Sequence, residues 1–290
     1  MKTQFADFRE AIADINPSEF HETASAKALL AIPELSDSKV KTYYAPFDYT
    51  NCKAKLVLVG ITPGQSQMNK ALYAACTALN NGHSDIEALH AAKIAASFGG
   101  KMQTILINLL DSHKINTYLG ISSCEELWSK SNHLVNFTSC LRNPVFSLKG
   151  VAEVNYTGGT PNLATYKGFT RSLAMFGDEL NLIPNAMIVP LGRNVANVIQ
   201  SLVDNGSVPL DRVLNAEGRV AEFPHPSGEN AETVNLAIGE FPDWEDYAEV
   251  MFRKYQNKVN GKTTESSYKA ARYSYWQRAR HTRVALKNFI

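Results

Sequence analysis

Two short segments combine residue types that could act on a ligand with anionic or hydrogen-bonding groups. The first is Gly-Ile-Thr-Pro-Gly at residues 60–64, directly after the apolar run at residues 56–59. A glycine turn after a buried strand lets the backbone approach a ligand closely, and the N-terminus of a following helix suits anionic groups. Alone, such a turn is more often structural, because Pro and Gly end many strands. It is neither a Walker loop nor a dinucleotide fingerprint.

The second segment is His-Pro-Ser-Gly-Glu-Asn at residues 225–230, after the apolar residues 221–223. It places an imidazole, a hydroxyl and an amide on one loop, and Pro224 and Pro226 stiffen its backbone. Such a loop can hold a phosphodiester while it presents a hydrogen-bond donor to a reacting base. A lone histidine is more often structural, but the pairing with residues 60–64 favours a functional site.

The elements that must position these segments alternate between apolar runs and helical patterns. Alternating strands and helices predict an α/β fold with three layers, α/β/α, around a central, mostly parallel four-stranded sheet, with ligands bound at the carboxyl ends of its strands. The expected strands are at residues 56–59, 133–138, 186–191 and 221–223, and the expected helices at 68–79, 86–96, 102–110, 166–180 and 194–203.

The chain divides into three regions. We expect an N-terminal helical and loop extension at residues 1–50, an α/β domain at 51–242, and a basic helical extension at 243–290. Residues 251–290 contain ten Lys or Arg and one Glu, although the whole chain has a net charge of only +1. This basic segment could follow a phosphate backbone, with its aromatic side chains stacking on bases, or it could be a solvated helix whose aromatic side chains pack on the domain.

Composition narrows the class of protein. With 290 residues, 44% of them hydrophobic, the chain can bury one sizeable core. Its apolar runs are far shorter than the ~20 residues of a membrane helix, and its N-terminus lacks a signal-peptide core. We therefore expect a cytoplasmic monomer without a membrane partner. The four cysteines form no Cys-x-x-Cys pair, so neither a zinc site, a disulfide framework nor another cofactor is expected.

The two segments, in this order, resemble the active-site motifs of the uracil-DNA glycosylase superfamily. Two intermediate segments extend the resemblance to its bacterial and archaeal thermostable branch. Residues 135–144 are similar to that branch's Thr-Asn-Val-Val-Lys-Cys-Arg-Pro strand, and residues 97–102 to its Pro-Phe-Val-Gly-Arg segment. The resemblance covers residues 55–230, and the flanks show none.

The resemblance implies a uracil-DNA glycosylase-like fold and a monofunctional DNA glycosylase. Such an enzyme flips a uracil-like or modified pyrimidine base out of DNA and hydrolyses its N-glycosidic bond, which leaves an abasic site. His225 would donate a hydrogen bond to the leaving base, and Thr62, Gln65 or Ser66 would orient the water. Phe98 would stack on the base and Asn136 would bind its edge. The other implied base contacts are Gly60, Ile61, Pro63 and Gly64, and the implied DNA contacts are Ser227, Gly228 and Asn230. Independently of the resemblance, the basic segment offers Arg272 and Arg280 as further candidate DNA contacts.

This chain departs from the family pattern in three ways. Residues 60–64 contain no carboxylate, so the water would be oriented by weak bases only. Of the branch's four iron–sulfur cysteines only Cys140 has a counterpart, so we predict no cluster. About 34 residues separate Gly64 from Phe98, roughly three times as many as in the branch, and this insertion would lie beside the base pocket. Two alternatives stay open: a glycosylase for a hypermodified base, such as glucosylated hydroxymethylcytosine in phage DNA, which would serve defence, and a non-catalytic DNA-binding protein.

Overall fold

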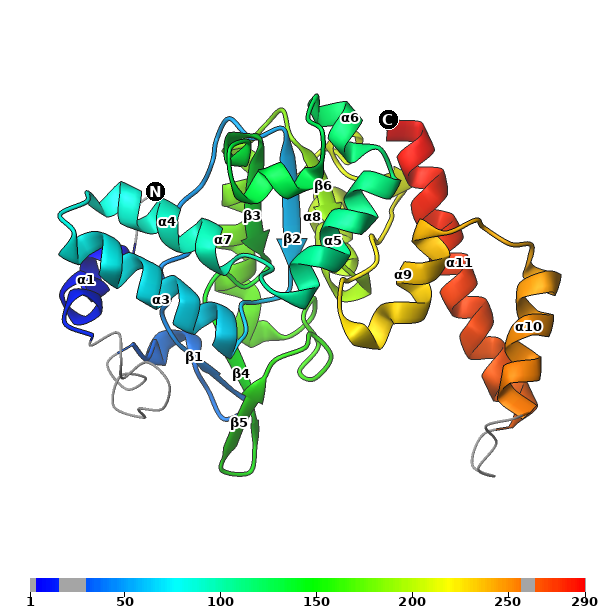
Figure 1. Ribbon diagram of the computed structural model, residues 1–290. Helices are drawn as coiled ribbons and strands as arrows, with labels where there is room; N and C mark the ends of the chain where they lie inside the picture. The colour runs from blue at the N-terminus through cyan, green and yellow to red at the C-terminus, as the bar shows by residue number, and fades with distance from the viewer. Residues whose placement is uncertain (1–3, 16–29, 257–263, 290) are drawn as a thin grey trace.

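A parallel sheet lies at the centre of the computed structural model, which describes residues 4–15, 30–256 and 264–289 (Figure 1). Its central strand is β2 (Leu56–Gly60), with β3 (Val135–Ser139) on one side and β6 (Met187–Pro190) on the other. Every residue of β2 is buried, as a continuous apolar run between two helical layers requires. The expected α/β class is confirmed.

The expected fourth strand is replaced by isolated contacts at the edge next to β6. In the part of the chain that the structure describes, the parallel sheet has three strands, and single parallel bridges join Leu191 to Phe223 and Ile188 to Val213. Pro224 follows Phe223 directly and has no backbone N–H, so the hydrogen-bond ladder cannot continue through it.

Helices cover both faces of this sheet (Figure 1). Leu56 and Leu58 of β2 pack towards α5 (Lys101–Ser112), whereas Val57 and Val59 pack towards α7 (Thr170–Asn181) and α8 (Arg193–Asp204). This alternation follows from the two-residue period of a strand. The first face is completed by α6 (Ile115–Leu119) and α9 (Ala231–Ile238).

A second, antiparallel sheet lies beside the amino-terminal helices. It joins β1 (Val40–Thr42), β4 (Val145–Lys149) and β5 (Ala152–Asn155), a pairing that the sequence patterns did not indicate. The small β7 (Asn215–Ala216) and β8 (Arg219–Val220) form a separate hairpin. Short 3₁₀ helices lie at Pro33–Leu35, Cys124–Trp128, Asn132–Leu134, Lys167–Phe169, Leu210–Arg212 and Gly228–Asn230.

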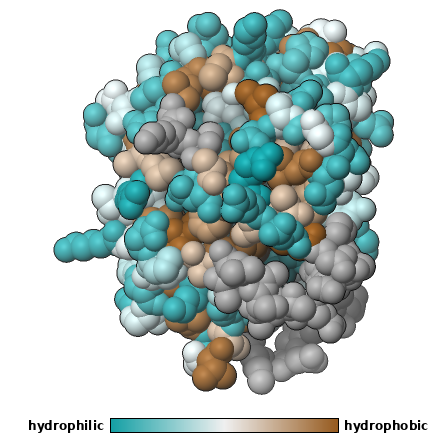
Figure 2. Space-filling view, turned by 90° about the vertical axis from the view of Figure 1, so that its left-hand side faces the viewer, coloured by the Kyte–Doolittle hydropathy of each residue, from teal (hydrophilic) through white to brown (hydrophobic). Residues whose placement is uncertain are grey.

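The insertion forms a helical hairpin, α3 (Gln65–Asn80) and α4 (Asp85–Ala96), against which α1 (Phe5–Ala13) packs. Ser84 caps α4 through a reciprocal pair of hydrogen bonds with Glu87, which explains why the second helix begins there. Figure 2 shows this side of the molecule, where apolar patches lie between hydrophilic side chains.

The carboxyl-terminal helices α10 (Trp244–Gln256) and α11 (Glu265–Phe289) form a pair that extends away from the central sheet (Figure 1). Their aromatic side chains pack on one another: the rings of Phe241 and Trp276 stack with centroids 5.3 Å apart, and Trp244 meets Tyr273 edge-on at 4.8 Å. Among the described residues, no helix combines the length and the apolar character that crossing a bilayer requires.

Candidate active-site cavity

A cavity of about 380 Å³ lies at the carboxyl ends of the parallel strands. Gly60 ends β2, Ser139 ends β3 and Leu191 follows β6, and all three line it. This is the position at which parallel α/β sheets bind ligands, and the volume is that of a small-molecule pocket.

Both sequence motifs reach this cavity, although they are far apart in the chain. Residues Gly60, Ile61, Thr62 and Gly64 form one part of its lining, and His225, Ser227 and Asn230 form another. Phe223 forms a parallel bridge with Leu191, the residue that follows β6. His225, two residues further along, therefore lies near the carboxyl end of β6. Gly192 lies against it: a Cβ built there would be 3.4 Å from the His225 Cβ, and its φ of +91° favours glycine at this turn.

The loop of residues 225–230 is held by its own hydrogen bonds. The Ser227 amide donates to the His225 carbonyl at 2.8 Å, and the Asn230 side-chain nitrogen donates to Ser227 Oγ at 3.0 Å. Because Ser227 Oγ accepts this bond, its hydroxyl proton can still be donated to a phosphate oxygen. Gly228 is exposed and lies outside the cavity lining.

Phe98 forms a wall of the cavity, as expected of a residue that stacks on a base. A Cβ at Gly60 would lie 3.4 Å from Phe98 Cζ, so the ring lies directly against the motif backbone. Phe98 adopts φ +48°, an unusual conformation for a side chain of this size, and it also packs on Phe137 at a centroid distance of 6.0 Å.

Of the side chains expected to orient the water, those of Thr62 and Gln65 form hydrogen bonds with other groups of the protein. Thr62 lines the cavity, but its hydroxyl donates to the Asn143 carbonyl at 2.9 Å and accepts from the Val145 amide at 3.1 Å. Gln65 does not line the cavity, and its side-chain nitrogen donates to Asn69 Oδ1 at 2.8 Å. Gln67, which the sequence reasoning did not single out, does line it, and its Oε1 accepts from the Gly64 amide at 3.0 Å.

Asn136 does not line the cavity, so the structure does not support the expectation that it binds the base. It is 2% exposed, its Nδ2 donates to Glu179 Oε1 at 3.1 Å, and its Oδ1 accepts from the Asn51 amide at 3.0 Å. The reason is its position near the amino end of β3, whereas Ser139 at the carboxyl end reaches the cavity. Pro63 lines a smaller adjoining chamber instead.

Glu179 belongs to a buried cluster of four charged side chains. It accepts from Arg142 Nη2 at 2.9 Å and lies 3.8 Å from Lys93 Nζ, while Arg142 Nη1 lies 3.9 Å from Asp48 Oδ1. Burial alone would raise the pKa of Glu179, but Lys93 and Arg142 outweigh it and hold that pKa below its usual range. Burial lowers the pKa of Lys93 to about 8.

Two arginines that the sequence reasoning did not identify lie on the cavity. Arg193 begins α8 and is largely exposed, and Arg278 comes from α11. Both approach Glu222: Arg278 Nε contacts Glu222 Oε1, and Arg193 Nε lies 3.9 Å from Oε2. The sequence shows that α11 carries many basic residues, but it does not show which of them faces a site. The packing of α11 against the domain shows that Arg278 does.

The expected DNA contacts Arg272 and Arg280 lie away from this cavity. Arg272 Nη1 forms an ion pair with Glu232 at 2.5 Å, and its guanidinium lies over the Tyr268 ring at 4.4 Å. Arg280 lies 6.0 Å from the Trp276 ring centroid and lines a separate hollow of about 640 Å³ near α9 and α11.

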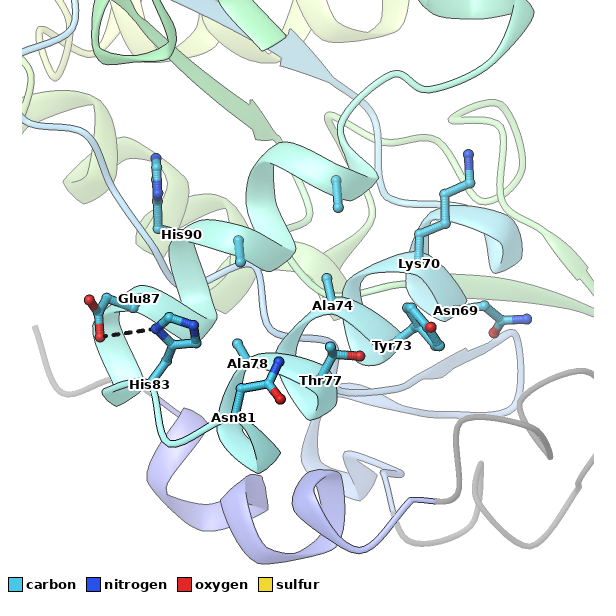
Figure 3. A pocket seen from close by; sticks show the side chains of 12 residues that line it. Asn69, Lys70, Tyr73, Ala74, Thr77, Ala78, Asn81, His83, Glu87 and His90 are labelled. Atoms are coloured by element: carbon cyan, nitrogen blue, oxygen red, sulfur yellow. Dashed lines mark ion pairs between the residues drawn. The ribbon is translucent and has the colours of Figure 1, made fainter. Parts of the chain in front are cut away.

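A larger groove, of about 730 Å³, runs between α3 and α4 of the insertion (Figure 3). Four alanines line it together with polar side chains, and two of these, His83 and Glu87, form an ion pair with their charged atoms 3.8 Å apart. It contains no residue of either motif. Lys70 at its end lies near Gly99, so the groove approaches the loop that carries Phe98. The insertion thus borders the cavity through Gln67 and this loop.

The described residues contain no group of three or more His, Cys, Asp or Glu side chains that could hold a metal ion. Cys140 is buried, and burial raises the pKa of its thiol.

Comparison with known proteins finds a relative in Bacillus subtilis. The chain is 34% identical, over 202 residues, to the uncharacterized protein YoxB of Bacillus subtilis (strain 168), a match that covers 67% of this chain and 73% of the relative. The chain therefore belongs to the same family as YoxB. No family model and no solved structure matches it.

Proposed function

We propose that this member of the YoxB family is a monofunctional DNA glycosylase of the uracil-DNA glycosylase type, which flips a uracil-like or modified pyrimidine base out of DNA. One observation carries the proposal: the motif at residues 60–64, the loop at residues 225–230 and Phe98 line a single cavity at the carboxyl ends of parallel strands. The sequence predicts that these three segments belong to one active site, and a common active site requires that they line the same cavity.

The arrangement of the sheet supports the same fold. The strand order is β3-β2-β6, and Phe223 forms a parallel bridge on the outer side of β6. A four-stranded sheet of this type would have its last strand at that position. Both motifs and Phe98 reach the cavity from a single chain, and we propose a monomer that acts on DNA in the cytoplasm.

The chemistry follows from the groups around the cavity. A nucleotide must leave the base stack before its C1′–N bond can be reached, and the flipped base would lie against the Phe98 ring. The C1′–N bond breaks, its electron pair leaves with the base, and His225 donates a hydrogen bond to the charge that collects there. Water then adds to C1′ and loses a proton to solvent, which leaves an abasic site.

The rim of the cavity suits the DNA backbone. Ser227 and Asn230 offer a hydroxyl and an amide from one loop, and Arg193 of α8 and Arg278 of α11, which both approach Glu222, add two guanidinium groups. Phosphate contacts of this kind fix the position of the nucleotide without reading its sequence.

The attacking water would be oriented without a strong base. None of the described residues that line the cavity is Asp or Glu, and Gln67 and Thr62 are the polar side chains of the first motif and its helix. A dissociative reaction tolerates such a water, because the sugar is already electrophilic when water attacks.

The decisive experiment is base release. The protein is incubated with single- and double-stranded oligonucleotides that contain uracil, hypoxanthine or glucosylated hydroxymethylcytosine, and alkali then cleaves any abasic site. We expect cleavage with at least one substrate, and a loss of at least about tenfold in His225→Ala. Mass spectrometry of the released base identifies the substrate and decides whether it is a plain or a hypermodified base.

The described lining of the cavity contains no carboxylate, and this also favours a second candidate, a protein on this fold that binds modified DNA without cutting it. Retained DNA binding with no alkali-sensitive site on any substrate would support that candidate and overturn the glycosylase.

A further inference from the structure

Glu222 joins the edge of the parallel sheet to the carboxyl-terminal helix, three residues before His225. On the sheet side, the amide of its neighbour Phe223 donates to the Pro190 carbonyl at 2.8 Å. On the helix side, the buried hydroxyl of Thr282 on α11 donates to the Glu222 carbonyl at 2.7 Å. These two hydrogen bonds use the backbone, so they fix the place of Glu222 without involving its side chain.

The carboxylate of Glu222 connects the two arginines that line the cavity. Its Oε1 accepts a hydrogen bond from Arg278 Nε, and its Oε2 lies 3.9 Å from Arg193 Nε. Glu222 itself is 8% exposed and is not part of the cavity lining. It therefore acts on the cavity through these arginines and not by contact with a ligand.

The same carboxylate offsets the repulsion between the two guanidinium groups. Among the described residues, Glu222 is the acid with which each of them forms an ion pair. Without that negative charge, each guanidinium group lowers its energy by moving away from the other and into water. A fixed carboxylate therefore keeps both groups beside the cavity.

The two arginines are held to different degrees. The Arg278 side chain is 17% exposed and donates a hydrogen bond to Glu222, whereas the Arg193 side chain is 61% exposed and lies 3.9 Å from the carboxylate. A charge-assisted hydrogen bond is a strong contact, and an exposed ion pair is a weak one. Glu222 therefore controls the position of Arg278 more than that of Arg193.

We propose that Glu222 is a positioning residue that holds the Arg278 guanidinium at the cavity, where it binds a phosphate of DNA next to the flipped nucleotide. This inference rests on the proposed function. An acid beside a DNA-binding surface ordinarily weakens binding by repulsion, and its removal then strengthens binding. The positioning role predicts the opposite result.

The test is a double-mutant cycle of Glu222→Leu and Arg278→Gln. It uses duplex oligonucleotides that contain the three bases of the release assay. Glu222→Leu should weaken binding by about tenfold and lower the slope of log affinity against log salt by about 1, as the loss of one phosphate contact does. The variant with both substitutions should bind no more weakly than Arg278→Gln alone. Tighter binding by Glu222→Leu would overturn the proposal.

Two further variants follow from the unequal contacts. Glu222→Gln keeps an acceptor for Arg278 Nε, so its loss of binding should be about threefold or less. Arg193→Gln should leave most of the effect of Glu222→Leu in place, because the Arg193 contact is the weaker one. If the effect disappears in Arg193→Gln and persists in Arg278→Gln, the assignment to Arg278 is wrong.

Base release separates positioning from a general disturbance of the site. A phosphate contact that is equally strong in the ground state and the transition state changes KM and leaves kcat unchanged. Glu222→Leu should therefore release base more slowly at low DNA concentration and at the wild-type rate at saturation. An equal fall in kcat would show that the substitution disturbs the loop that carries His225, and it would overturn the positioning role.

A matched glutamate and a folding measurement serve as controls. Glu232→Leu removes the acid that pairs with Arg272, also on α11 but away from the cavity, and should leave DNA binding and its salt slope unchanged. Urea unfolding shows whether each variant is folded. If Glu222→Leu does not fold, Glu222→Gln replaces it in the cycle, and a loss that persists in the Arg278→Gln background then contradicts the proposal.

Binding and base release together distinguish the two levels of the proposal. If base is released but Glu222→Leu has no effect, or its effect adds to that of Arg278→Gln, the positioning role is wrong and the glycosylase stands. If no base is released but the two effects on binding fail to add, the positioning role stands and catalysis fails. If DNA is neither bound nor cut, both are wrong.

Discussion

Asn136 on β3 donates its side-chain hydrogen bond to Glu179 on α7 at 3.1 Å, inside the protein and away from the cavity. A second bond, from the Asn51 amide to Asn136 Oδ1, ties the same side chain to the segment before β2. This asparagine therefore joins three parts of the chain.

Asn136→Ala should lower stability and leave the chemistry largely intact. The substitution removes partners from Glu179 and from the Asn51 amide, and we expect a loss of about 1–3 kcal/mol in the free energy of unfolding. Urea unfolding measures this, with His225→Ala as the matched variant that should lose base release at unchanged stability. Loss of base release by Asn136→Ala with wild-type unfolding would instead make it a base contact.

Glu179→Gln tests the buried charge cluster through its pH dependence. Loss of the carboxylate leaves Lys93 and Arg142 buried with one fewer partner, so we expect about 3–5 kcal/mol less stability at pH 7. The pKa of Glu179 is lowered in the folded state, so its contribution is present above about pH 4.5 and is lost as the pH falls through the folded value. The stability difference from wild type should therefore shrink below pH 4.5, and a constant difference would contradict this assignment.

Phe98→Leu should weaken base release while the protein stays folded. Leucine fills much of the space beside Gly60 but cannot stack, and stacking of a base on an aromatic ring contributes about 1–3 kcal/mol. The expected loss in base release is about 5- to 150-fold, measured at substrate concentrations well below saturation. Phe137→Leu, which alters the ring that Phe98 packs on, is the control for indirect effects. Equal losses in both variants would argue against direct stacking.

Arg278→Gln should weaken DNA binding more than Arg272→Gln. Both arginines pair with a glutamate, Arg278 with Glu222 and Arg272 with Glu232, but only Arg278 lines the cavity. If Arg278 contacts one phosphate, its loss should lower the slope of log affinity against log salt by about 1 for duplex DNA, and Arg272→Gln should leave the slope unchanged. A larger effect of Arg272→Gln than of Arg278→Gln would instead indicate that the DNA contacts lie on the part of α11 that carries Arg272.

Much of the α/β architecture could be read from the sequence because it depends on local patterns. The apolar run of residues 56–59 predicts a buried strand, and α3, α4, α5, α7 and α8 each overlap a helical pattern in the sequence. The β4 and β5 strands were missed, since their residues are only partly buried and their pairing with β1 joins distant segments.

By itself the sequence determined which segments could do chemistry, because turns, strand ends and stiff loops are encoded by neighbouring residues. The tertiary structure decided which side chains within them meet. Ser139 reaches the cavity and Asn136 does not, because only the carboxyl end of β3 opens onto it. Gln67 and Arg278 come to the site from an insertion and a terminal helix, and their positions depend on packing between elements distant in the chain, which no local pattern records.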